Sequence, residues 1–210
     1  MKQRQLEMVL EAIEGFQYPE IELEQYQTPS PLAAEILHFA FMQGDLDDSV
    51  QDLGCGTGIL AIGAKLLGVT NVVGYDADPK ALEIAKINAK KLGVEANFIF
   101  SDIARIKGHV KTTLMNPPFG ARVKGKDRSF ISSALRTSNV IYSIHNRGSF
   151  AFIQKFIKPA IITHSYVAKF PIKRIFNFHK KERKVIEVEI YRITVPEYIQ
   201  NSVQFKVSNL

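Results

Sequence analysis

The first 42 residues carry apolar side chains at the spacing of amphipathic helices. Between Leu6 and Ile13 these side chains recur every three or four positions, and the pattern predicts a helix over residues 3–14. A second helix is predicted over residues 31–42, with Ser30 as its N-cap and Pro31 as its first helical residue. We expect both helices to belong to an N-terminal extension, residues 1–48.

From Val50 onward, short apolar strands alternate with helices. This alternation is typical of a parallel sheet that is covered by helices on both faces. The predicted strands are residues 50–53, 72–76, 97–100, 113–115, 140–144, 165–170 and 185–193, and the predicted helices are residues 59–67, 79–92 and 150–157. The last two strands suit an antiparallel addition to the sheet. We therefore expect an α/β fold.

Length and composition favour one soluble domain over residues 1–210. A chain that is 46% hydrophobic can bury one large core, to which the apolar side of the first helix should contribute, and residues 49–210 form the expected main fold. No apolar run approaches the ~20 residues of a membrane span, and the N-terminus lacks the apolar segment of a signal peptide. We expect a cytoplasmic protein. Its single cysteine, Cys55, excludes an intramolecular disulfide and a cysteine-rich zinc site, and we predict no bound metal.

The net charge of +6 hides an uneven distribution along the chain. Residues 1–50 contain ten acidic residues against two basic ones, a net charge of −8, so the remaining 160 residues carry +14. A nucleic acid would be attracted to one part of such a surface and repelled by another. A basic run can also be ordinary solvated surface, so charge alone does not decide the function.

A glycine-rich turn follows the first predicted strand, in the sequence Asp52-Leu53-Gly54-Cys55-Gly56-Thr57-Gly58. Glycines at a strand-to-helix junction let the backbone approach a ligand closely. Their alternating spacing differs from the G-x-G-x-x-G spacing of dinucleotide sites and fits S-adenosylmethionine better. Asp76 and Asp102, at the ends of the next two strands, are placed to accept from the ribose hydroxyls and from the adenine amino group of that cofactor.

The fourth predicted strand is followed by Asn116-Pro117-Pro118-Phe119-Gly120. The two prolines stiffen this loop and remove two backbone donors. The side-chain oxygen of Asn116 and the carbonyl of Pro117 can then hold both N–H bonds of an exocyclic amine, which aims the nitrogen lone pair at an activated methyl group. Phe119 can stack on a base that has been turned out of its strand. The residues from Asn116 to Phe119 are therefore the candidate catalytic residues.

Five segments together resemble one family, the "methyltransferase-like five" proteins, in an archaeal-looking form. The segments are Gln25-Tyr26-Gln27-Thr28, Asp52-Leu53-Gly54-Cys55-Gly56, Met115-Asn116-Pro117-Pro118-Phe119-Gly120, Tyr142-Ser143-Ile144-His145 and Phe178-His179-Lys180-Lys181. Members of this family are small-subunit ribosomal RNA adenine-N6 methyltransferases. The likeness spans Leu6 to about Ile193 and implies a Rossmann-like class I methyltransferase fold, with a seven-stranded, mostly parallel sheet.

The resemblance also implies site residues and a partner. The implied cofactor contacts are Gln25, Thr28, Gly54, Thr57, Ile59, Asp76 and Asp102, beside Gly56 of the same turn. The implied partner is a small zinc-containing activator subunit of the tRNA-methyltransferase-112 type, which pairs along the edge strand of the sheet in that family. Here that edge is Asn97–Phe100, an apolar strand that risks aggregation if it is left bare. Asn146 departs from some relatives, which carry lysine at that position.

Substrate contacts are the least specific of the expected features. The candidates for RNA contact are His145, His179, Lys180 and Lys181. A histidine at a strand end is more often only hydrogen-bonded locally, and a lysine run can be a solvated turn before a strand. Two other functions stay open: methylation of another planar amine, such as a release-factor glutamine or guanine N2, and a non-catalytic role as a cofactor-binding RNA or ribosome scaffold.

Overall fold

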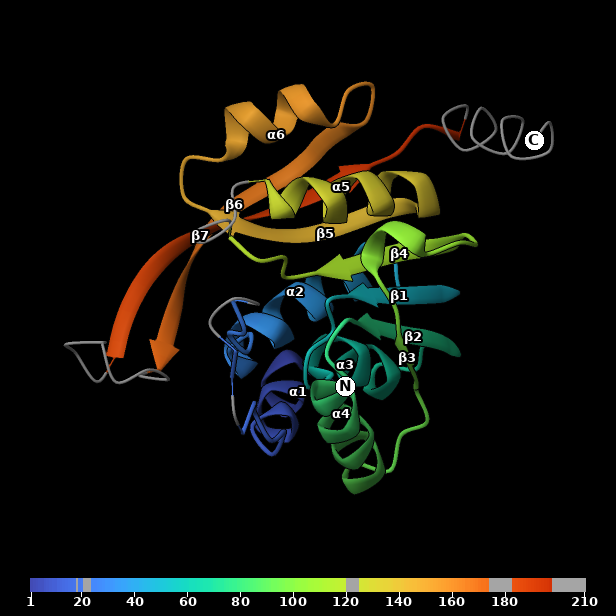
Figure 1. The fold of residues 1–210 in the computed structure, drawn as a ribbon, viewed down its shortest axis with the longest axis vertical. Coiled ribbons are helices and arrows are strands. Elements are labelled where there is room, and N and C mark those ends of the chain that lie inside the picture. Colours follow the sequence, from blue (N-terminus) through green and yellow to red (C-terminus); the bar gives the residue numbers. More distant parts are fainter. Residues whose placement is uncertain (18, 21–23, 120–124, 174–182, 198–210) are drawn as a thin grey trace.

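The computed structural model describes residues 1–17, 19–20, 24–119, 125–173 and 183–197 (Figure 1). A single seven-stranded sheet runs through the molecule in the order β3-β2-β1-β4-β5-β7-β6. The strands are β1 (Ser49–Leu53), β2 (Asn71–Asp76), β3 (Asn97–Phe100), β4 (Val110–Met115), β5 (Ser138–Asn146), β6 (Ile161–Lys173) and β7 (Arg183–Thr194). The first five strands pair in parallel, and β7 is antiparallel to both β5 and β6. The predicted α/β fold and its antiparallel addition are confirmed.

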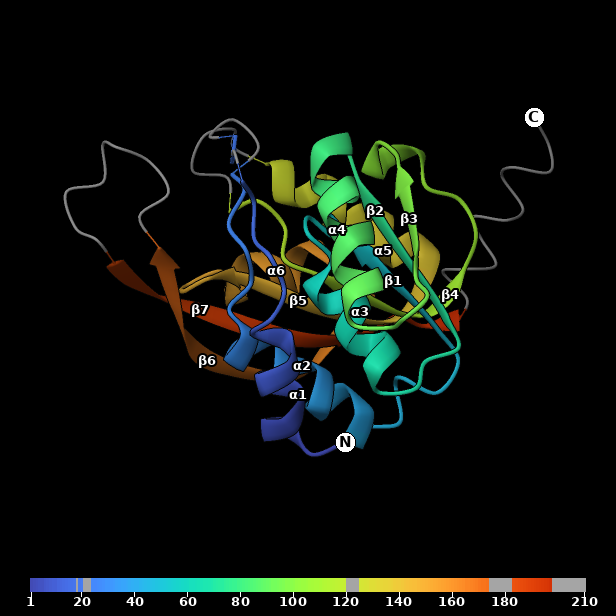
Figure 2. The same cartoon turned by 90° about the horizontal axis from the view of Figure 1, so that it is seen from below.

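Helices cover both faces of the sheet (Figure 1 and Figure 2). They are α1 (Gln3–Leu10), α2 (Ser30–Met42), α3 (Ile59–Leu66), α4 (Pro79–Lys91), α5 (Lys126–Thr137) and α6 (Phe150–Phe156), with a short 3-10 helix, η2 (Ile103–Arg105). One core packs α1, α2 and α3 through side chains such as Leu10, Leu37 and Ile62. A second core, around Ile131 and Ile153, packs α5 and α6 against the other face. The N-terminal extension is thus part of the main hydrophobic core.

Several predicted boundaries were wrong. Ser30 is not the N-cap of α2: Pro29 occupies that position in an extended conformation, and its carbonyl accepts the first helical hydrogen bond from Ala33 N at 2.9 Å. Helix α1 ends at Leu10 because the backbone turns there, although Ile13 remains buried. Helix α5 was not predicted at all. Its apolar residues Phe130, Ile131, Ala134 and Leu135 do fall at helical spacing, but serines and charged residues make the segment polar on average, so it was not recognised as a helix.

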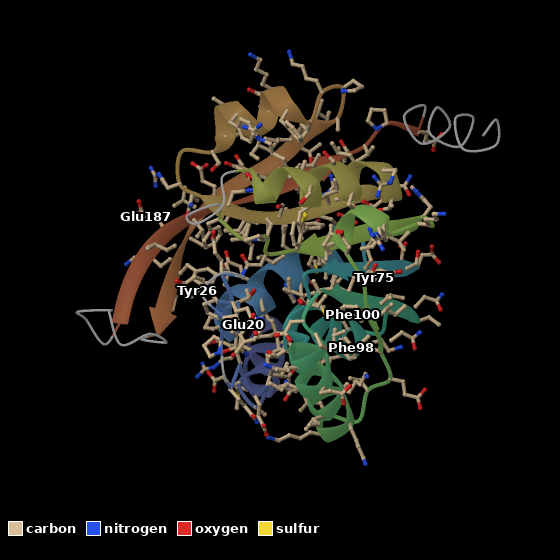
Figure 3. All side chains as sticks on the ribbon, in the orientation of Figure 1. Glu20, Tyr26, Tyr75, Phe98, Phe100 and Glu187 are labelled. Atoms are coloured by element: carbon tan, nitrogen blue, oxygen red, sulfur yellow. The ribbon has the colours of Figure 1, made fainter. Side chains whose placement is uncertain are left out.

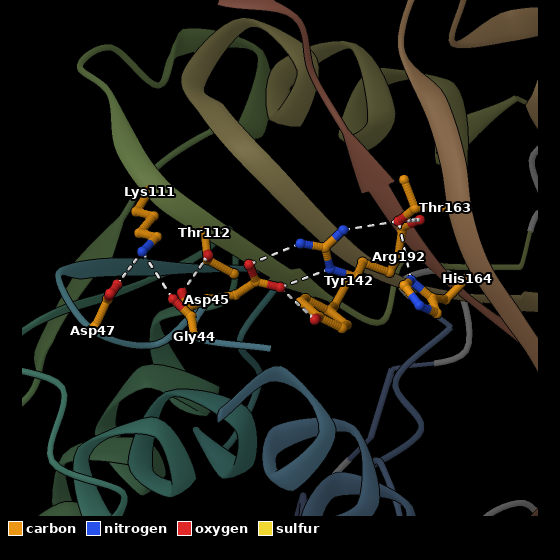
Figure 4. Close-up of polar contacts among 9 residues, drawn as sticks. All are labelled: Gly44, Asp45, Asp47, Lys111, Thr112, Tyr142, Thr163, His164 and Arg192. Carbon is orange, nitrogen blue, oxygen red and sulfur yellow. Dashed lines mark hydrogen bonds and ion pairs between the residues drawn. The ribbon is translucent and has the colours of Figure 1, made fainter. Parts of the chain in front are cut away.

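A buried polar cluster joins the end of the extension to the last strand (Figure 4). The Asp45 carboxylate accepts from Arg192 Nε at 2.8 Å and from the Arg192 Nη2 at 2.9 Å, and it also accepts from the Tyr142 hydroxyl at 2.6 Å. The Arg192 Nη1 donates to Thr163 Oγ1 at 2.8 Å, which ties in β6. Burial and the Asp45 carboxylate together raise the pKa of the Tyr142 hydroxyl, so the tyrosine stays a donor. This cluster fixes the antiparallel strands to the parallel half of the sheet.

The two edges of the sheet are β3 and β6. On β3, Ile99 is 44% exposed and Phe100 is 65% exposed, so the predicted apolar edge strand lies at the surface. In Figure 3, Phe98 and Phe100 lie at the β3 edge of the sheet, away from Glu187 on β7. In the described parts of the chain, no helix combines the length and the apolar character needed to cross a membrane.

Candidate active site

The glycine turn between β1 and α3 needs a backbone that only glycine adopts easily. Gly54, Gly56 and Gly58 all have positive φ, at 69°, 52° and 90°. A Cβ on Gly54 would lie 2.8 Å from the Phe130 ring, and a Cβ on Gly56 would lie 2.7 Å from the Phe16 ring. Aromatic rings therefore pack directly on Gly54 and Gly56, and a side chain at either position would collide with them.

Two carboxylates border this turn, the buried Asp52 and the half-buried Asp76. Asp52 is 1% exposed and accepts from Ala61 N at 3.0 Å. Burial raises the pKa of Asp52 to about 7; the Ala61 hydrogen bond lowers it, and the neighbouring Asp76 charge raises it further. Asp76 accepts from Gly56 N at 2.7 Å and from Asp78 N at 2.9 Å, and burial also raises its pKa. The two carboxylates create a negative potential at the turn, and this potential would favour the binding of a cationic ligand.

Asp102 lies at the end of β3, as expected, but it is exposed and caps η2. Its Oδ1 accepts from Ala104 N at 2.9 Å. The carboxylate is thus held by its own loop, and its contact with a cofactor adenine stays a prediction.

The loop after β4 places one polar side chain against the turn. Asn116 Nδ2 donates to Thr28 Oγ1 at 3.0 Å, and Thr28 is only 4% exposed. The other amide atom, Asn116 Oδ1, is enclosed and has no hydrogen-bond partner among the described residues. A buried acceptor without a donor costs about 1–3 kcal/mol, so such an atom is normally paired with a water molecule or a ligand.

The rest of this loop is braced from the antiparallel side of the sheet. Pro117 is buried, and Pro118 and Phe119 are half-buried. The Phe119 ring meets Phe170 of β6 edge to face, with centroids 5.9 Å apart. Asn146 Nδ2 donates to the Phe119 carbonyl at 3.5 Å, so the residue that departs from some relatives contacts this loop here. The carboxyl ends of β4, β5 and the long β6 strand thus meet at one place.

A cavity lies between the glycine turn and Asn116. Its lining includes Phe16, Tyr26, Thr28, Asp52, Gly54, Gly56, Thr57, Ile59 and Asn116. Thr57 Oγ1 is enclosed and, like Asn116 Oδ1, has no partner in the described part of the chain. Burial raises the pKa of the Cys55 thiol well above its usual range, so this lining residue is not a thiolate. Bare glycine backbone, nearby carboxylates and two unpaired oxygens fit a cationic nucleoside such as S-adenosylmethionine.

The extension between α1 and α2 forms one wall of the cavity, and Asn88 holds it there. Asn88 of α4 is fully buried; its Oδ1 accepts from Glu14 N at 2.9 Å, and its Nδ2 donates to the carbonyls of Glu14 and Thr57, both at 3.0 Å. Sequence reasoning missed Asn88 and Phe16. A polar residue on the otherwise apolar, buried face of a helix is the signal that marks Asn88.

Gln25 is committed to protein contacts on the same wall. Its Nε2 donates to Asp78 Oδ2 at 2.7 Å, and its Oε1 accepts from Glu20 N at 2.7 Å. Gln25 therefore ties the extension to the start of α4, while its contact with a cofactor remains a prediction.

His145 lies at the end of β5 but does not face solvent. It is 3% exposed, its Nε2 lies 2.6 Å from Ser143 Oγ, and its ring stacks on Tyr191 with centroids 5.5 Å apart. Burial lowers the pKa of His145 to about 4, so the imidazole is neutral at physiological pH. The local hydrogen bond is present, and contact with RNA stays a prediction. His179, Lys180 and Lys181 lie outside the described residues.

Relatives of this chain are found over most of its length. The family model described as ribosomal protein L11 methyltransferase (PrmA) matches residues 35–114. An uncharacterized protein of Methanocaldococcus jannaschii is 41% identical over 207 residues, which cover 92% of this chain and 94% of that protein. The rRNA N6-adenosine-methyltransferase Mettl5 of Drosophila melanogaster is 35% identical over 209 residues, which cover 93% of this chain and 97% of that enzyme.

A solved structure shares the whole architecture. A protein of Pyrococcus horikoshii matches with a TM-score of 0.87 and 35% identity, and the match covers 93% of this chain and 98% of that one. The agreement therefore extends to the N-terminal extension and to the late strands, which the family model does not reach.

Proposed function

The chain belongs to the Mettl5 family of rRNA N6-adenosine methyltransferases, and on that premise we propose that it methylates N6 of an adenine in small-subunit ribosomal RNA. It is a methyltransferase that uses S-adenosylmethionine, with the Rossmann-like fold of that enzyme class. The observation that carries the proposal is Asn116 Oδ1, an enclosed acceptor with no partner in the described structure, on a proline-stiffened loop beside the glycine turn. An exocyclic amine offers the donor that this oxygen lacks.

The cofactor residues are proposed from the cavity lining and from the resemblance. Gly54 and Gly56 would bring bare backbone against the cofactor, and Thr57 Oγ1 would supply a hydrogen-bonding oxygen. Ile59 and Thr28 line the same cavity, and Asp76 lies at the adjoining strand end. Gln25, Asp76 and Asp102 already form hydrogen bonds with protein groups in the structure, so each would contact the cofactor with its remaining hydrogen-bonding capacity.

Asn116 to Phe119 would act by holding the target amine. When bound, S-adenosylmethionine would supply a methyl group activated on sulfur: an N–C bond would form as the S–C bond breaks, the thioether S-adenosylhomocysteine would be the leaving group, and the nitrogen would lose one proton. Asn116 Oδ1 accepts one N–H and the Pro117 carbonyl accepts the other, which draws the nitrogen lone pair out of conjugation with the ring. Pro118 keeps the loop stiff, and Phe119 offers an aromatic face to the base. The proton is released to water or to a nearby carbonyl.

The decisive experiment compares RNA and protein products. Small-subunit ribosomal RNA, and release factor as a competing substrate, would be incubated with the chain, its activator and S-adenosylmethionine, and then digested for mass analysis. We expect one N6-methyladenine in the RNA, which is also missing from ribosomes of cells that lack this protein. A methylated glutamine, or N2-methylguanine with unmodified adenine, overturns the proposed substrate. No transfer to any substrate favours the scaffold function.

We propose further that β3 binds the small zinc-containing activator subunit. The support is a four-residue edge strand with an exposed phenylalanine and isoleucine, a surface that soluble proteins seldom leave bare. Phe100→Lys is expected to abolish copurification with the activator, whereas Val167→Lys, on the opposite edge strand β6, leaves it intact. Copurification that survives Phe100→Lys, or full activity of the isolated chain, contradicts this partner assignment.

A further inference from the structure

Thr28 and Asn116 share a single hydrogen bond, and its direction decides what the catalytic loop can hold. In the structure Asn116 Nδ2 donates and Thr28 Oγ1 accepts, at 3.0 Å. A hydroxyl has one proton and two lone pairs, so it can also donate. If the amide of Asn116 turned over, Thr28 would donate to Oδ1, and the NH₂ group would face the cavity. An NH₂ group facing another NH₂ group cannot accept its hydrogen.

The acceptor of the Thr28 hydroxyl proton would determine the orientation of the Asn116 side-chain amide. Apart from the bond to Asn116, Thr28 has no hydrogen bond within the described chain, so its proton has no acceptor there. Thr28 lines the same cavity as Thr57 and the glycine turn, where the cofactor is proposed to bind. If an oxygen of the cofactor accepted this proton, the Thr28 hydroxyl could only accept a hydrogen bond from Asn116. Asn116 would then have to present its Nδ2 to Thr28, because its Oδ1 has no hydrogen to donate.

We infer that Thr28 is a positioning residue that links cofactor binding to the orientation of Asn116. The hydroxyl donates to an oxygen of the bound cofactor and thereby holds Asn116 Oδ1 toward the target amine. The inference rests on the proposed function, because it requires both ligands at this site. It also gives the N-terminal extension a role in catalysis, since Thr28 reaches Asn116 across 88 positions of sequence.

Two variants separate the hydroxyl from the rest of the side chain. Thr28→Val keeps the shape and removes the hydroxyl, and Thr28→Ser keeps the hydroxyl. At saturating cofactor, we expect Thr28→Val to lower kcat about 10- to 100-fold with the KM for RNA nearly unchanged, as for other losses of positioning. Thr28→Ser should restore kcat to within about threefold. An unchanged kcat in Thr28→Val overturns the inference.

A second measurement needs no RNA. The side-chain NH₂ resonances of Asn116 would be followed in the full chain with and without S-adenosylhomocysteine, a non-reactive probe whose affinity for each variant is measured by calorimetry. Slower exchange of these hydrogens on adding the probe, in the wild type and Thr28→Ser but not in Thr28→Val, supports the link. An equal response in Thr28→Val contradicts it. This measurement does not involve RNA, so it still tests the link between Thr28 and Asn116 if adenine in ribosomal RNA proves to be unmethylated.

Discussion

Two of the buried polar clusters among the described residues, one around Asp45 and one around Asn116, differ in how fully their atoms are paired. Around Asp45, both carboxylate oxygens receive hydrogen bonds, and the partners Tyr142 and Arg192 are themselves fixed between strands (Figure 4). Around Asn116, two oxygens, on Asn116 and Thr57, are enclosed and have no donor within the described chain. A complete network stabilises a fold, whereas an incomplete one lowers stability unless a ligand completes it. We therefore expect the cluster around Asp45 to stabilise the fold and the cluster around Asn116 to bind a ligand.

The largest effect is expected at the incomplete cluster. Asn116→Ala removes one of two acceptors for the target amine, so kcat should fall about 1,000-fold or more, comparable to losing a transition-state hydrogen bond. Cofactor affinity and thermal stability should stay close to wild type, because the Asn116 side chain forms a single hydrogen bond with the described part of the chain. Single-turnover kinetics and calorimetry measure the two quantities. Asn146→Ala, which removes an exposed contact to the same loop, is the control and should keep kcat within about threefold. A large loss of stability in Asn116→Ala would show that this cluster is structural after all.

At the fully paired cluster around Asp45, a substitution should lower stability and leave activity nearly unchanged. Asp45→Ala leaves Arg192 buried without its counter-charge, which should lower the free energy of unfolding by about 3–4 kcal/mol while kcat at a permissive temperature stays near wild type. Denaturant unfolding measures the change. Asp47→Ala is the matched control, because its ion pair with Lys111 is exposed, and it should leave the unfolding midpoint nearly unchanged. Equal stability of the two variants would contradict the structural assignment of Asp45.

A smaller effect is expected from filling the glycine turn. Gly56→Ala adds a Cβ that meets the Phe16 ring at 2.7 Å, on a backbone with positive φ. We expect cofactor affinity to fall about 10- to 30-fold, because the backbone or the ring must move out of its ligand-facing position. Gly68→Ala has the same kind of backbone strain with nothing within 4 Å of the new Cβ, and it should bind the cofactor normally. Titration calorimetry compares the two, and equal losses would mean that strain, not the contact, sets the affinity.

The sequence predicts the glycine turn and the catalytic loop of this site better than it predicts the contacts between distant segments that enclose them. Glycine spacing and the Asn-Pro-Pro-Phe run are local patterns, and each lies at the carboxyl end of a predicted strand where the structure has it. The pairing of Asn116 with Thr28 joins segments 88 positions apart. No periodicity reports such a contact, and only the family resemblance selected Thr28 beforehand.

The burial of polar side chains is a second property of this site that could not be predicted from the sequence. His145 reads as an available histidine at a strand end, yet it is enclosed beside Ser143 and Tyr191. Asn88 reads as an ordinary helix residue, yet it holds the extension against the glycine turn. The exposure of a polar side chain depends on packing between distant elements, so residue type and spacing do not determine it.

The smallest effect concerns Asp52, the acid that precedes the glycine turn. With a pKa of about 7 in the free protein, it is mostly protonated at pH 6 and mostly ionised at pH 7.5. A cationic cofactor prefers the ionised form, so affinity should rise with pH across this window, by about eightfold from the change in ionised fraction. Calorimetry at the two pH values measures the increase, and Asp52→Asn should abolish it. Affinity that is flat with pH in the wild type would mean that Asp52 belongs with Asp45 as a structural carboxylate, and that the negative potential at this edge comes from Asp76 alone.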